Sequence, residues 1–154
     1  MPRAIRSMVL SGLALGALLV GGVGVAQASD NTLRATLNAF APKISKDENG
    51  VRNGLIGYPQ GKVRPLVRAL NHEVGDLHSL KRKLSHEKAS SAKGRKARND
   101  IVKGLSLIAS AYGALRKDVQ AAHGGPVPKA QVNAAIATDK KGRKKLLAGL
   151  HLLS

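Results

Sequence analysis

One short segment of the chain has the residue types and spacing of a catalytic metal site. In His72-Glu73-Val74-Gly75-Asp76, an imidazole and a carboxylate stand four residues apart with a glutamate between them. On a helix, His72 and Asp76 lie one turn apart and could share a metal ion, with Glu73 as the general base. The zinc-protease pattern H-E-x-x-H, however, has a second histidine where this chain has Asp76. Both ligand candidates also fall on the face opposite the apolar residues. We interpret them as exposed side chains and predict no metal site here.

Other patterns that would indicate an enzyme are missing from the sequence. There is no Cys, which excludes disulfides, thiolate zinc sites, haem attached through Cys and a Cys nucleophile. No serine stands in a G-x-S-x-G setting. The Glu-x-x-His motif of di-iron bundles is absent, and the remaining histidines show no ligand spacing with one another. The sequence therefore predicts a protein that is not an enzyme and that needs no cofactor.

Lysine and arginine dominate the charge of the chain. The sequence has 26 Lys and Arg against 9 Asp and Glu, a formal net charge of +17. This excess predicts attraction to polyanions such as nucleic acid, anionic lipid or an acidic wall polymer. Three clusters supply the candidate polyanion-binding residues, which are Lys81, Arg82, Lys83, Lys93, Arg95, Lys96, Arg98, Lys140, Lys141, Arg143, Lys144 and Lys145.

Residues 94–99 fit the pattern x-B-B-x-B-x, in which B is basic, that is linked to sulfated polysaccharides. In a chain this rich in Lys and Arg the pattern also arises easily by chance. The alternative is a solvated basic surface that keeps an exported protein soluble. With one Phe, two Tyr and no Trp, the chain has too few rings to stack single-stranded bases. We therefore do not expect sequence-specific recognition of nucleic acid.

The first 28 residues have the order of parts of a secretory signal peptide. Arg3 and Arg6 give a positive start, residues 8–25 are apolar and uncharged, and Ala26-Gln27-Ala28 is an A-x-A cleavage pattern. An uncleaved membrane anchor is the alternative, because about 18 apolar residues can just span a bilayer. We expect cleavage after residue 28, a secreted or cell-envelope location, and no transmembrane segment in the remaining chain.

Residues 29–154 are expected to form a single domain of amphipathic helices. Over residues 99–119 the large apolar residues recur four and three apart, which places them on one helix face. They are Ile101, Leu105, Ile108, Tyr112, Leu115 and Val119. Small residues around this stripe, Gly104 among them, would let neighbouring helices approach closely. The predicted fold is all-α, a small antiparallel up-down bundle of three to four helices.

The other helices are less regular in sequence. Pro42 lies within the first apolar pattern, and Asp47 or Glu48 interrupts it. Residues 31–56 are then either one kinked helix or two pieces, and we favour one helix because a loop over 42–60 would be unusually long. The second helix spans about residues 62–88, with a stripe of Val63, Val67, Leu70, Val74, Leu77 and Leu84 that is widened by Leu66 and Leu80.

The last two helices have uncertain limits. The third is expected to begin between Ser91 and Asn99, and it is stopped by the Gly and Pro residues of 123–128. The fourth has large apolar residues near both of its ends but none over residues 139–145, and Gly142 allows a break there.

Short turns make sequential helices antiparallel neighbours, so the second helix ends where the third begins and the fourth returns towards that end. The three basic clusters are then expected to gather at one pole. The functional hypothesis is an exported, non-enzymatic bundle whose basic pole contacts an anionic polymer or an anionic membrane surface. A metal- or small-molecule-binding bundle and a structural partner in an envelope complex are the alternatives.

Overall fold

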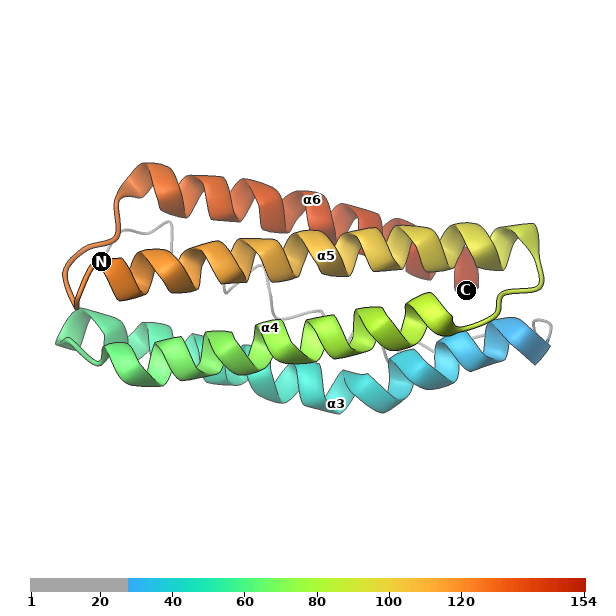
Figure 1. Ribbon diagram of the computed structural model, residues 1–154, viewed down its shortest axis with the longest axis horizontal. Coiled ribbons are helices and arrows are strands. Elements are labelled where there is room, and N and C mark those ends of the chain that lie inside the picture. The colour runs from blue at the N-terminus through green and yellow to red at the C-terminus, as the bar shows by residue number, and fades with distance from the viewer. Residues whose placement is uncertain (1–27) are drawn as a thin grey trace.

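The structure is a computed structural model that describes residues 28–154 of the chain. These residues form four long helices, α3 (Ala28–Gly57), α4 (Val63–His86), α5 (Ala92–Ala121) and α6 (Lys129–Leu153), and one short 3-10 helix, η1 (Tyr58–Gln60). Figure 1 shows the four helices side by side, each running opposite to the one before it. The predicted all-α bundle is confirmed, with four helices.

The predicted signal peptide concerns residues 1–28, almost all of which lie outside the described residues, so export stays a prediction. Within residues 28–154, no helix combines the length and the apolar character needed to cross a bilayer.

The first helix continues through Pro42, which confirms the prediction of one helix rather than two pieces. α3 is 30 residues long with Pro42 inside it, and Figure 1 shows a bend along its length. Pro42 itself is exposed, so its ring and the hydrogen bond it removes are on the solvent side. The residues of α3 that are buried in the core are Leu33, Leu37, Ala41, Ile44, Val51 and Leu55.

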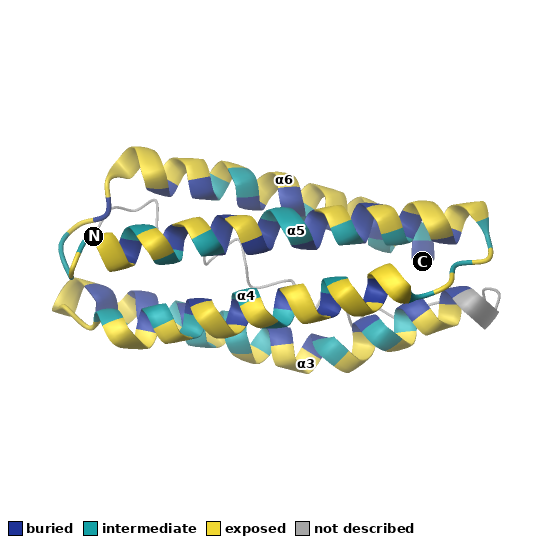
Figure 2. Cartoon of the chain, viewed as in Figure 1, coloured by how far each residue is buried: buried dark blue, intermediate teal, exposed yellow. Residues whose placement is uncertain are grey.

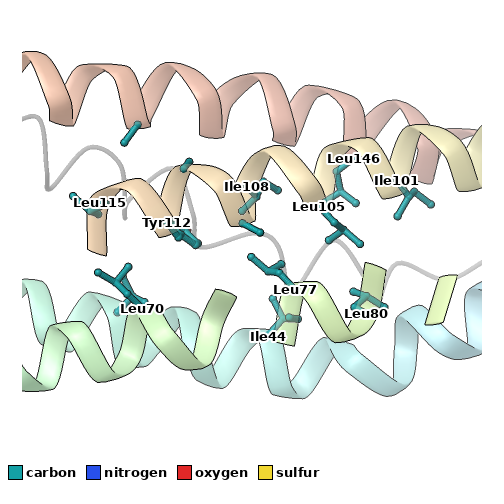
Figure 3. Packing of buried hydrophobic residues seen from close by; sticks show 14 of the residues in the cluster. Ile44, Leu70, Leu77, Leu80, Ile101, Leu105, Ile108, Tyr112, Leu115 and Leu146 are labelled. Carbon is teal, nitrogen blue, oxygen red and sulfur yellow. The ribbon is translucent and has the colours of Figure 1, made fainter. Parts of the chain in front are cut away.

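The six-residue stripe of α5 forms the centre of the core. All six residues are at most 5 % exposed. In Figure 3, Leu105 and Ile108 face Leu77 of α4 across the interior. A stripe with this 4-3 spacing stays on one side of a helix over five turns, so a single face of α5 reaches every layer of the bundle.

Leu105→Ala or Ile108→Ala is expected to lower the free energy of unfolding by about 2–5 kcal/mol, because each deletes fully buried methyl groups and leaves a cavity. Lys103→Ala changes an exposed residue of the same helix and should cost under about 0.5 kcal/mol. Urea unfolding of the three variants measures the difference. Equally small losses at all three positions would show that this face is not the core.

Small residues bring α5 and α6 together more extensively than any other helix pair. A Cβ added at Gly104 would lie 2.7 Å from the carbonyl oxygen of Gly142, and one added at Gly142 would lie 2.7 Å from Cγ1 of Ile108. A Cβ at Gly149 would meet the carbonyl oxygen of Ala97 at 2.7 Å. Glycine at these positions allows backbone-to-backbone packing. The break considered at Gly142 does not occur, because α6 is continuous there and buries its glycines against α5.

Ser91 fixes where α5 begins, at the early end of the predicted interval. Its Oγ accepts a hydrogen bond from the Gly94 N–H (2.7 Å) and donates one to Asp30 Oδ2 (2.8 Å). Ser91 is thus a helix N-cap that also ties the start of α3 to the start of α5. At the other end of the bundle, the Tyr58 hydroxyl donates to the carbonyl oxygen of Gly125 (2.5 Å) and joins η1 to the α5–α6 loop.

Candidate functional site

Positive and negative side chains are sorted between the surface and the interior of the bundle. The described residues include all nine Asp and Glu, and none of the nine is exposed: four are buried and five are half-buried. Of the 24 Lys and Arg in residues 28–154, 18 are exposed. Figure 2 shows exposed residues along the outer faces of all four helices. The outer surface is therefore more uniformly positive than the net charge implies.

The α4–α5 loop brings two of the three predicted clusters together. The seven candidate residues between 81 and 98 lie at one end of the bundle, which we call the α4–α5 end. Two of them also stabilise the loop, because Arg95 Nη1 donates to the carbonyl oxygen of Ser90 (2.6 Å) and Arg98 Nη1 donates to that of Glu87 (2.7 Å). Arg82 and Lys93 are exposed and form no hydrogen bond or ion pair within the described residues.

The third cluster, on α6, lies beside the middle of α5 and not at the α4–α5 end. Its register is set by Gly142, which packs against Gly104. Asp100 connects this cluster to the one on α5, because Lys96 Nζ lies 3.0 Å from Asp100 Oδ2 and Lys145 Nζ lies 3.4 Å from Asp100 Oδ1. The last two turns of α6 extend beyond the cluster. The three clusters are neighbours, but they do not all lie at one end of the bundle, as the prediction of a single basic pole required.

The opposite end of the bundle is basic as well. Lys62, Arg64 and Arg68 are exposed at the start of α4, and Lys117 and Lys129 are exposed on either side of the α5–α6 loop. Cations thus lie at both ends of the bundle, and Lys62, Arg64 and Arg68 are at the end opposite the predicted basic pole.

Arg143 does not belong to the exposed surface, although it was a candidate polyanion-binding residue. Its side chain is only 12 % exposed. Nε donates to Asp139 Oδ2 (2.8 Å), and Nη2 donates to the Tyr112 hydroxyl (3.1 Å). Nη2 also lies 3.7 Å from Glu48 Oε1. Arg143 follows Asp139 by one helical turn on the buried side of α6. The ion pair with the Asp139 carboxylate keeps the Arg143 side chain directed inward.

These contacts belong to a buried polar layer to which all four helices contribute. The layer consists of Glu48 of α3, Glu73 of α4, Tyr112 of α5, and Asp139 and Arg143 of α6. Glu73 is fully buried, and neither of its carboxylate oxygens has a hydrogen-bond partner among the described residues. Burial, together with repulsion from Glu48, raises the pKa of Glu73 to about 9. At neutral pH its carboxyl is therefore protonated, and Arg143 balances Glu48 and Asp139.

The residues of the H-E-x-x-D segment separate into different environments. Glu73 is in the core, whereas His72 is exposed and Asp76 is half-buried. Asp76 accepts a hydrogen bond from Lys43 of α3 (2.6 Å). Among residues 28–154, no group of three or more His, Asp and Glu side chains is arranged to hold a metal ion.

Comparison with protein-family models, with curated proteins and with solved structures finds no match to this chain.

Proposed function

We propose that the chain is an exported, non-enzymatic helical bundle that binds an anionic polymer through its basic surface. The observation that carries the proposal is the sorting of charge, with 18 exposed Lys and Arg and no exposed Asp or Glu in residues 28–154. Because the carboxylates are buried or half-buried, most of the exposed cations form no ion pair within the described residues; Lys43, Lys96 and Lys145 are exceptions, since they contact Asp76 or Asp100. Such a surface attracts polyanions over long distances, and binding gains entropy as condensed counterions leave the polymer.

An anionic polymer is favoured over a membrane surface because the described surface is poor in apolar side chains. Its exposed large hydrophobic residues are Ile56 and Leu147, which lie on different helices. A helix that lies in a membrane interface needs a broad apolar face as well as cations. Contact with anionic lipid would therefore rest on charge alone. Export to the compartment where such a polymer occurs rests on the signal-peptide pattern of residues 1–28.

We expect the strongest contact at the α4–α5 end together with the neighbouring α6 cluster, because ten of the 18 exposed Lys and Arg lie there. Two triple variants that remove the same charge test this. Arg82→Gln, Lys88→Gln and Lys93→Gln change the α4–α5 end, and the matched control carries Lys62→Gln, Lys117→Gln and Lys129→Gln at the opposite end. All six residues are exposed, so the helical circular dichroism should stay unchanged.

The first triple variant is expected to weaken binding to long-chain polyphosphate at least about tenfold in about 0.15 M salt, and the control less than about fivefold. Arg95 and Arg98 are left intact because they stabilise the α4–α5 loop. Equal losses of affinity in the two variants would contradict a localised contact and would show that the polymer is attracted diffusely by the whole surface. Failure of the wild-type chain to bind polyphosphate, heparin or DNA would reject polymer binding altogether.

A further inference from the structure

A groove between α3 and α4 collects cations around a concave space. Its volume is about 630 Å³. Lys43 and Lys46 line it from α3, and Arg64, Arg68 and His72 line it from α4. The three α4 residues are four positions apart, so they form one row along the helix, and the two lysines are three apart on the opposite wall. The groove is distant from the α4–α5 end.

Small residues keep this space open. Gly50, Pro65 and Ala69 line the groove between the two rows of cations. A Cβ at Gly50 would be 3.5 Å from the Cβ of Ala69, so α3 and α4 approach closely here. The residues that line the groove beside the cations are therefore small.

The two carboxylates in the groove neutralise only part of this charge. Asp76 is paired with Lys43 (2.6 Å). Burial, together with the interaction with the Asp76 carboxyl, raises the pKa of Asp47 to about 6. Within the described residues, Lys46, Arg64 and Arg68 form no ion pair. Three unpaired cations and His72 therefore face the hollow.

We infer that the α3–α4 groove is a binding site for a terminal phosphate group, the end of an oligophosphate or a phosphate monoester. Guanidinium groups one helical turn apart can each bind phosphate oxygens with two parallel hydrogen bonds, and the lysine across the groove adds a point charge. Concave walls of low dielectric concentrate the field of these cations. The site goes beyond the proposed polymer contact, because it takes one small anion at one place and can exist with or without that contact.

Calorimetric titration of the full chain with inorganic tripolyphosphate in about 0.15 M salt tests the site. The groove variant is Arg64→Gln with Arg68→Gln. The matched control is Lys117→Gln with Lys129→Gln, which removes two exposed cations that line neither the groove nor the proposed polymer contact. We expect one tripolyphosphate per chain, a loss of affinity of at least about tenfold in the groove variant, and less than about threefold in the control.

A second measurement locates the ligand directly. Amide NMR shifts caused by tripolyphosphate should be confined to residues 43–50 and 64–76. Several ions bound per chain, equal losses in the two double variants, or shifts spread along α5 and α6 would each overturn the inference.

A third measurement distinguishes a lipid phosphate from a free phosphate. It compares the binding of the wild-type chain and the groove variant to vesicles of phosphatidylcholine with phosphatidic acid. A loss by the groove variant with both the soluble probe and the vesicles supports the site with a lipid phosphate among its ligands. A loss with the soluble probe alone supports the site with a free phosphate. Because the polyphosphate test above uses variants outside the groove, either proposal can fail while the other stands.

Discussion

Glu73→Gln is expected to stabilise the bundle at neutral and alkaline pH. The folded protein holds the Glu73 carboxyl in a fully buried position without a hydrogen-bond partner among the described residues. Burial and the nearby carboxylates of Glu48 and Asp47 raise its pKa from 4.5 to about 9. Between these two pH values the folded chain keeps a proton that the unfolded chain has lost. The stability linked to Glu73 is thus fully present below about pH 4.5 and falls as the pH rises towards 9.

The size of this effect follows from the same linkage. Each pH unit in the window lowers the free energy of unfolding by about 1.4 kcal/mol, which amounts to about 3 kcal/mol at pH 7 and on the order of 6 kcal/mol at pH 9. Gln is neutral and similar in shape at every pH. Its advantage over Glu should accordingly be near zero at pH 4.5 and largest at pH 9.

Other carboxyls add to the pH dependence without obscuring Glu73. Burial raises the pKa of Asp139 and raises that of Asp47 to about 6, so both also favour the folded state at acid pH. A hydrogen bond from Lys96 lowers the pKa of Asp100, and the stability from that group is lost only as the pH falls below its ordinary value of 3.8. The difference between wild type and Glu73→Gln isolates the one residue.

Urea unfolding of the two proteins at about pH 5, 7 and 9 measures the prediction. Asp118→Asn serves as the control, because it removes a half-buried carboxylate of α5 outside the polar layer. The control should follow the wild-type pH dependence, and Glu73→Gln should depart from it with rising pH. A constant difference between Glu73→Gln and wild type would mean that Glu73 is ionised in the folded state.

Arg143→Met is expected to destabilise the bundle by about 3–5 kcal/mol at pH 7. The substitution keeps much of the side-chain volume but removes the cation that contacts Asp139, Glu48 and the Tyr112 hydroxyl. Removing one partner from a buried ion pair leaves the others charged and unpaired in a medium of low dielectric, which is costly. The neighbouring exposed residue gives the control, since Lys144→Met should cost under about 0.5 kcal/mol.

A double variant distinguishes loss of the cation from loss of packing. Asp139→Leu with Arg143→Met replaces the closest ion pair by apolar side chains, and such replacements are often neutral or stabilising. We expect the double variant to recover most of the stability that Arg143→Met loses in urea unfolding. A double variant as unstable as the single one would show that packing, and not the unpaired carboxylate, causes the loss.

The fold was largely predictable from the spacing of apolar residues, as α5 shows. The same 4-3 spacing continues on α4 through Leu66, Leu70, Glu73, Leu77, Leu80 and Leu84, all of which are buried. Because Glu73 occupies one position of this pattern, the predicted stripe included Val63, Val67 and Val74 instead. These three valines are only partly buried and pack at the margin of the core. The charge of Arg143, on a different helix, helps to balance the carboxylates around Glu73. Spacing along one helix cannot show an interaction of this kind.

α6 shows a second limit of the apolar pattern. The middle of α6 lacks large apolar residues, which suggested a break in the helix. In the structure, the small residues there let Gly142 pack against Gly104 of α5. A signal was present in the seven-residue spacing of Ala135, Gly142 and Gly149 opposite that of Ala97, Gly104 and Ala111. A repeat of small residues at this interval marks a helix face as clearly as a repeat of leucines does.

For the candidate site, the sequence located the basic clusters but could not assign each cation to a face. Arg143 and Lys144 are adjacent in one basic run, yet Arg143 is in the interior and Lys144 is exposed. The burial or partial burial of some carboxylates likewise depends on contacts between helices, such as Lys43 of α3 with Asp76 of α4 and Lys145 of α6 with Asp100 of α5. The α3–α4 groove joins residues from two helices and has no counterpart in any single segment.

If the exposed cations bind an anionic polymer, as we propose, the affinity must fall steeply as the salt concentration rises. Duplex DNA is a suitable model polymer, because the logarithm of the affinity falls with the logarithm of the salt concentration by about 0.9 for each phosphate neutralised. The exposed cations of the three clusters are expected to engage on the order of four to six phosphates, which gives a slope of about −4 to −5. A slope near zero between about 50 and 200 mM salt, or no binding at the lower concentration, would contradict the claim.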